Sequence, residues 1–98
     1  MKYEVIFSSY ANRDIAILAE ILAPYPNKAR RLFSEMERKL DLLKNNPLMC
    51  EQYSTAPKYR RMNLEDHTLF YTVDESNRQI RIYRVIYSKR DISKLLNN

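Results

Sequence analysis

Glycine is absent from all 98 residues. Phosphate-cradling loops, dinucleotide-binding fingerprints and EF-hand turns all depend on glycine, so these classes of nucleotide and calcium site are excluded. A single histidine, His67, and a single cysteine, Cys50, lie far apart and cannot supply zinc ligands at the usual spacing. We therefore expect neither a metal nor a cofactor.

Long apolar runs are also missing. The longest, IAILAEILA, is short and contains Glu20, so no transmembrane span is expected. Met1 leads directly into an alternating strand pattern, without the order of a signal peptide. One cysteine cannot form an internal disulfide, which suits a reducing cytoplasm. We expect a cytoplasmic protein with one domain over residues 1–98.

The first half of the chain predicts a strand and two helices. Residues 2–7 alternate as a strand does, and residues 10–23 repeat apolar side chains at helical spacing. The sequence PYPN (24–27) breaks that helix, because two prolines so close cannot lie in a helix interior. A second amphipathic helix follows over about 28–44. The two helices form an αα-hairpin with a very short turn.

The second half predicts a β-meander. Residues 48–57 have no clear pattern and are expected to form a loop. Strand-like runs then follow at 59–64, 68–73 and 78–87, joined by short polar links that favour antiparallel pairing. Residues 91–96 predict a short C-terminal helical turn. The expected fold is α+β, in the order β-α-α-β-β-β, with the helical hairpin packed on an antiparallel sheet.

Positive charge is concentrated near the C-terminus. The formal net charge is +5, and nine basic against five acidic residues between 58 and 94 account for +4 of it. The predicted partners are therefore anionic, either nucleic acid or an acidic protein. Arginines with tyrosines suit both single-stranded RNA and protein interfaces, so composition leaves both open. The candidate binding residues are Arg60, Arg61, Arg81, Tyr83, Arg84, Tyr87, Lys89 and Arg90.

The sequence YRRMNLEDHTLFYTVDESNRQIRIYRVIYSKRD (59–91) resembles the C-terminal signature of the RelE/ParE toxin superfamily of bacterial type II toxin–antitoxin modules. The resemblance extends in outline over the whole chain and implies the same element order. One branch, RelE-like, cleaves messenger RNA on the ribosome and needs a base, an acid and cations. The other, ParE-like, poisons DNA gyrase.

The residues favour the ParE-like branch. In a ribonuclease, Arg60 and Arg90 match expected cations, and His67 or Tyr87 would have to act as acid or base. Met62, Thr68 and Leu96 occupy three further positions where that branch carries functional side chains. The family's usual glycine after the post-helix proline is also absent, since LMC (48–50) follows Pro47.

The resemblance therefore implies a growth-arresting toxin of a plasmid-stabilisation module, acting on gyrase. Its partner would be an acidic antitoxin, disordered before binding, that anchors apolar residues on the αα-hairpin in a hetero-oligomer. Two alternatives are a ribosome-dependent messenger RNA endonuclease and a non-toxic family member that only binds nucleic acid or antitoxin.

Overall fold

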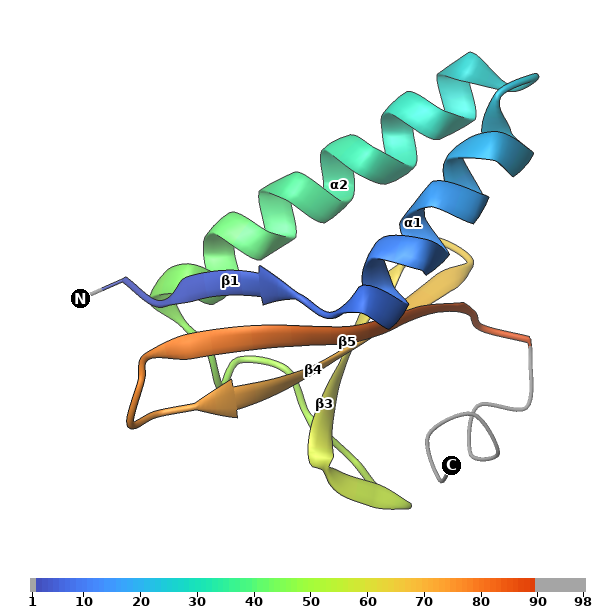
Figure 1. Ribbon diagram of the computed structural model, residues 1–98. Helices are drawn as coiled ribbons and strands as arrows, with labels where there is room; N and C mark the ends of the chain where they lie inside the picture. Colours follow the sequence, from blue (N-terminus) through green and yellow to red (C-terminus); the bar gives the residue numbers. More distant parts are fainter. Residues whose placement is uncertain (1, 90–98) are drawn as a thin grey trace.

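The helices form the predicted hairpin on one side of a sheet (Figure 1). The computed structural model describes residues 2–89. Helix α1 spans Ser9–Leu22, and its N-cap Ser8 accepts a hydrogen bond from the Ala11 amide at 3.0 Å. Helix α2 spans Pro26–Asn45 and begins at a proline, whose missing N–H has no helical partner at that position. The predicted hairpin is confirmed.

The five-stranded sheet has the order β1-β5-β4-β3-β2. Four of its strands form an antiparallel meander, in which each strand pairs with the next one along the chain. They are β2 (Gln52–Tyr53), β3 (Ala56–Leu64), β4 (His67–Asp74) and β5 (Gln79–Tyr87). Strand β1 (Glu4–Phe7) pairs in parallel with β5, because the helical hairpin carries the chain back across the sheet. The α+β class is therefore confirmed, and the sheet is mixed.

One detail of the prediction is wrong, and another falls outside the part of the chain that the structure describes. Residues 48–57 are not entirely loop, because β2 and the start of β3 fall within them and form a short hairpin. The expected turn at 91–96 lies outside the described residues. The two-residue and four-residue links of the meander each use a left-handed residue that is not glycine, Glu65 (φ 53°) and Arg78 (φ 52°).

The main core lies between the hairpin and the sheet. Leu32 and Leu43 of α2 pack there with Tyr71, Ile80 and Ile82, all of them fully buried. A second apolar cluster, built on Tyr59, Phe70 and Ile86, lies apart from this core. Within residues 2–89, neither helix has the length and hydrophobicity needed to cross a membrane.

A β-bulge in β5 decides which of the two clusters its later residues join. Phe70 is opposite Arg84, but the next residue of β4, Tyr71, is opposite Ile82, so Tyr83 is the extra residue. The bulge reverses the alternation beyond it. Ile86 therefore joins the second cluster, away from Ile80 and Ile82, although strict alternation placed all three on one face.

Candidate functional site

Arg60 holds the segment between α2 and β2. Its Nη1 donates to the backbone oxygen of Cys50 at 2.7 Å and to that of Leu48 at 3.4 Å. Beside it, the Tyr71 hydroxyl donates to the Pro47 oxygen at 3.0 Å. Burial raises the pKa of Tyr71 well above its ordinary value, so the hydroxyl keeps its proton and remains a donor. Arg60, one of the cations expected in a ribonuclease site, is thus hydrogen-bonded to backbone carbonyls.

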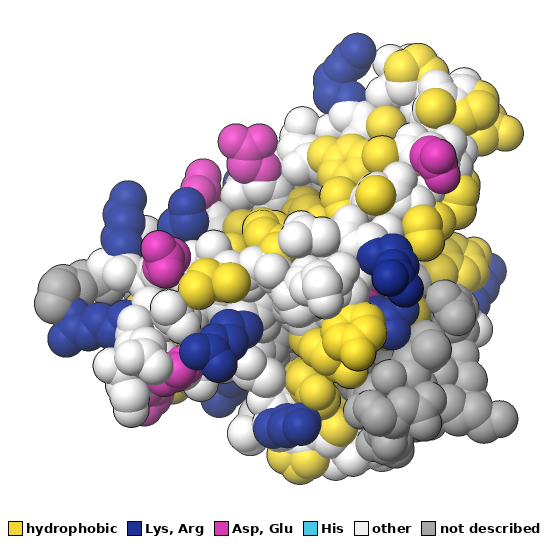
Figure 2. Space-filling view, viewed as in Figure 1, with side chains coloured by type: hydrophobic (Ala, Val, Ile, Leu, Met, Phe, Trp, Pro, Cys, Tyr) yellow, Lys and Arg dark blue, Asp and Glu magenta, His cyan; other side chains and the backbone are white. Residues whose placement is uncertain are grey.

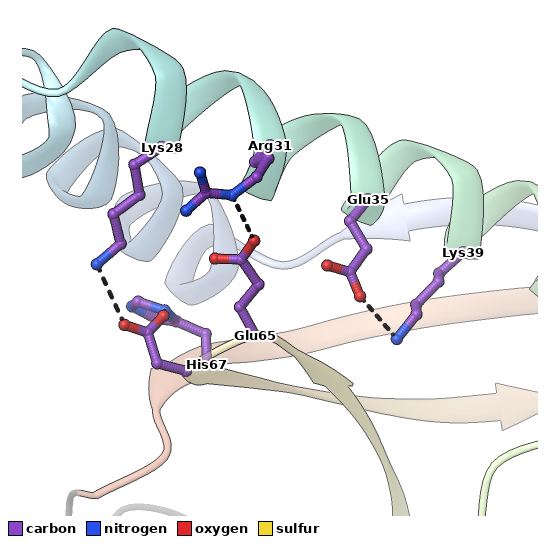
Figure 3. A network of polar contacts seen from close by, with 7 residues as sticks. Lys28, Arg31, Glu35, Lys39, Glu65 and His67 are labelled. Carbon is purple, nitrogen blue, oxygen red and sulfur yellow. Dashed lines mark hydrogen bonds and ion pairs between the residues drawn. The ribbon is translucent and has the colours of Figure 1, made fainter.

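His67 and Tyr87 lie together at the other end of the sheet. Their rings meet edge to face with centroids 5.6 Å apart, and His67 Nδ1 lies 2.9 Å from Asp66 Oδ1. Asp66 also accepts from Lys28 Nζ at 3.3 Å (Figure 3). Partial burial raises the pKa of Asp66, but the hydrogen bonds from His67 and Lys28 outweigh it and leave the pKa below its ordinary value. The carboxylate therefore orients the imidazole.

The fold does not bring Arg60 to His67. His67 is opposite Leu64 in the β3–β4 ladder, and Arg60 is opposite Tyr71, four residues further along β4. Four residues of strand correspond to about 13 Å. Met62 is buried in the main core, and Arg90 lies outside the described residues. The candidate ribonuclease residues that the structure describes are therefore split between two places.

Arg84 forms an internal ion pair with Asp14 of α1. Its Nε and Nη2 donate to the Asp14 carboxylate at 2.7 and 3.0 Å, and the two side chains are only 18% and 13% exposed. The Val85 amide donates to the same carboxylate at 2.9 Å. This hydrogen bonding raises the pKa of Arg84, although burial opposes it. Asp14 thus neutralises a cation that the sequence assigned to a partner.

Strand β5 has an unpaired edge beyond Ile82, where its ladder with β1 ends. The N-terminal part of α1 covers this edge. The Ser8 hydroxyl donates to the Tyr83 oxygen at 2.8 Å, and Asp14 accepts from the Val85 amide. The Tyr83 carbonyl and the Val85 amide on this edge are therefore already paired within the chain and are not available to a partner strand.

The remaining predicted residues are dispersed. Arg61 pairs with Glu51 at 2.6 Å and Arg81 with Asp74 at 3.2 Å, while Lys89 is exposed. Tyr83 stacks on Tyr59 with centroids 4.9 Å apart and meets Tyr10 edge-on at 5.8 Å. Burial raises the pKa of Tyr83, and the neighbouring tyrosines add to this. Because Arg61, Arg81 and Arg84 each pair with a carboxylate, most of the described arginines of the predicted basic surface are neutralised within the chain.

An exposed apolar surface lies instead on α1. Tyr10, Ile17 and Ile21, here called the α1 outer stripe, are 55%, 47% and 62% exposed. Their spacing of seven and four residues places them on one helix face. Hydrophobic side chains reach the surface over α1 and the α1–α2 turn (Figure 2). The apolar spacing over residues 10–23 predicts the helix but does not show which of its apolar side chains remain exposed.

A hollow of about 250 Å³ adjoins this stripe. It is lined by Asp14, Ile17, Leu18, Ile21, His67, Val85 and Tyr87. The wall is mostly aliphatic, with a carboxylate and an imidazole among the lining groups, so it can accept an apolar side chain from a partner. Residues 2–89 contain no group of three or more potential metal-binding side chains.

Comparison with known proteins identifies the family. The family model described as the ParE toxin of the type II toxin–antitoxin system parDE matches residues 5–92. No curated protein sequence matches the chain.

Similar solved structures share the fold at low identity. The chromosomal ParDE toxin–antitoxin system of P. aeruginosa gives a TM-score of 0.71 at 16% identity, over 90% of this chain and 98% of that one. A mutant RelE toxin of E. coli gives 0.71 at 15% identity, over 99% and 93%. The RelBE2 complex of Mycobacterium tuberculosis gives 0.59 at 22% identity, over 89% and 99%. Because the family model matches nearly the whole sequence, this chain belongs to the ParE toxin family of type II toxin–antitoxin systems.

Proposed function

We propose that this toxin arrests bacterial growth by poisoning DNA gyrase in the cytoplasm, as part of a plasmid-stabilisation module. The ParE family match and the incomplete ribonuclease set support it. The observation that carries the proposal is the position of Arg60. Its guanidinium is bonded to the Leu48 and Cys50 carbonyls and lies about four strand residues from His67, so it is poorly placed to stabilise a phosphorane there.

Purified gyrase provides the direct test. Adding toxin to gyrase, ATP and relaxed plasmid is expected to reduce supercoiling and to leave cleaved plasmid after protein digestion. A heat-denatured sample of the same toxin controls for contaminants. Full supercoiling at a stoichiometric excess of folded toxin would contradict the proposal.

A second candidate function is RelE-like cleavage of messenger RNA. One observation favours it, since His67 is oriented by Asp66 and touches Tyr87, an arrangement that can serve acid–base chemistry. Losing an acid–base group would reduce such cleavage by roughly 10²–10⁴-fold.

Growth arrest by His67→Ala and Tyr87→Phe variants separates the two functions. If gyrase is the target, both variants are expected to arrest growth about as well as the parent after induction. Immunoblotting for equal toxin levels is the control. New 5′ ends in a translated message that disappear in His67→Ala would instead establish the ribonuclease.

The antitoxin is the second proposed partner. Two of the structural relatives are a ParDE system and a RelBE2 complex, so a toxin of this fold is found with an antitoxin there. In this chain the α1 outer stripe offers exposed apolar side chains beside the hollow at His67 and Tyr87. An amphipathic antitoxin helix with apolar anchors would cover both, forming the toxin–antitoxin hetero-oligomer.

A further inference from the structure

Helix α2 has two sides of different charge balance. Toward the β3–β4 turn its cations are paired, with Lys28 on Asp66 at 3.3 Å and Arg31 on Glu65 at 3.0 Å (Figure 3). Further along the same helix, Lys39 pairs with Glu35 of α2 itself at 2.9 Å. The Lys28 and Arg31 pairs join α2 to the β3–β4 turn, and Lys39 also donates to the Asn63 backbone oxygen at 2.6 Å. The neighbouring, solvent-facing side of the helix carries further cations.

The solvent side carries a row of hydrogen-bond donors. Asn27, Arg30, Ser34 and Arg38, here called the α2 outer stripe, are all exposed and follow one another at three- and four-residue spacing. Within residues 2–89, neither Arg30 nor Arg38 has a carboxylate at ion-pair distance; Arg30 reaches only the Asn27 amide oxygen, at 3.5 Å. The Cα atoms of Arg30 and Arg38, eight residues apart, are separated by about 12 Å along the helix axis.

Helix stability does not account for this charge. The first turn of α2 contains no acidic residue, and Lys28, Arg30 and Arg31 follow within its first six positions. Cations near a helix N-terminus oppose the macrodipole, which favours anions there. A bound polyanion would offset that penalty where it neutralises the cations near the start of the helix.

The composition of the stripe distinguishes between possible anions. Arginine, serine and asparagine side chains are typical donors to phosphate oxygens. The stripe holds no aromatic side chain, which single-stranded nucleic acid uses for base stacking. It also holds no apolar side chain, whereas a protein interface normally has an apolar centre. The α2 outer stripe therefore suits the phosphodiester backbone of a duplex better than a single strand, whose bases need stacking partners, or an acidic peptide.

We propose that the α2 outer stripe binds the phosphodiester backbone of duplex DNA without sequence preference. This surface is separate from the α1 outer stripe and from the His67–Tyr87 hollow. The proposal does not depend on gyrase being the target, since it concerns DNA binding by the toxin itself.

Salt dependence of DNA binding tests the assignment. Binding of the full-length toxin to a labelled 20-base-pair duplex of arbitrary sequence is followed by fluorescence anisotropy at 50 and 200 mM salt. Each neutralised phosphate contributes about −0.9 to the slope of log affinity against log salt, so Arg30→Gln/Arg38→Gln is expected to flatten the slope by about 1.8. Between 50 and 200 mM salt, the affinity of the parent for the duplex is therefore expected to fall by a factor about 12 times larger than that of the variant.

The matched control is Arg61→Gln/Arg81→Gln, which removes the same charge from residues paired to Glu51 and Asp74. It is expected to keep the parental slope. Circular dichroism confirms that each variant is folded. An unchanged slope in Arg30→Gln/Arg38→Gln, an equal loss in the control, or tighter binding of a single-stranded 20-mer than of the duplex would each overturn the proposal.

Discussion

Replacing Asp14 with alanine is expected to lower the free energy of unfolding by about 3–5 kcal/mol, a large share of the 5–15 kcal/mol that stabilises a typical domain. Asp14 accepts three hydrogen bonds, two from Arg84 and one from the Val85 amide. The substitution leaves a mostly buried guanidinium without its counter-charge and an edge amide without its acceptor. Urea denaturation followed by circular dichroism measures the change, provided the slope with denaturant stays constant.

Two variants control for the loss of a carboxylate as such. Asp41→Ala removes an exposed acid that pairs with Lys44 at 3.4 Å, and it is expected to cost less than about 1 kcal/mol. Arg84→Met/Asp14→Ala removes both partners and is expected to cost less than the two single changes together. If Asp14→Ala is no worse than Asp41→Ala, the ion pair does not anchor α1 to β5.

The helices of this fold could be predicted from local sequence. Leu32, Met36, Leu40 and Leu43 recur at helical spacing, and all four are buried on α2. Helical spacing is a local feature of the chain, so it can be recognised in the sequence without knowledge of the tertiary structure. The strands of the meander were predicted for the same reason.

The faces of β5 could not be predicted in the same way. A period-2 pattern through Ile80, Ile82, Arg84 and Ile86 looks continuous, but the bulge at Tyr83 shifts the second half by one residue. Val85 then enters the main core and Ile86 the second cluster. A bulge is set by pairing with the neighbouring strand and leaves no trace in the alternation itself.

The charge pattern predicted an excess of cations but not which of them remain available. Arg60 is committed to the Cys50 and Leu48 carbonyls, and Arg84 to a carboxylate 70 residues away. Net charge over a sequence window contains no information on such long-range partners. Arg30 and Arg38, in the half of the chain with less net charge, are the arginines of α2 without an acidic partner among residues 2–89.

Ile21→Asp in the α1 outer stripe is expected to weaken antitoxin binding by about 100-fold or more, close to 3 kcal/mol. Ile21 is 62% exposed and lines the hollow beside His67 and Tyr87, so an apolar anchor of the antitoxin would be buried against it. A carboxylate there must be desolvated on binding and would also repel an acidic partner. Calorimetric titration with the cognate antitoxin measures the affinity.

Leu42→Asp is the matched control, because Leu42 is a 44% exposed aliphatic residue on α2 rather than on the α1 outer stripe. It is expected to keep antitoxin affinity within a few fold of the parent. Both variants should retain a cooperative thermal transition, since neither side chain belongs to the main core. Equal weakening by both would place the antitoxin over the whole hairpin, whereas parental affinity in Ile21→Asp would remove the α1 outer stripe from the interface.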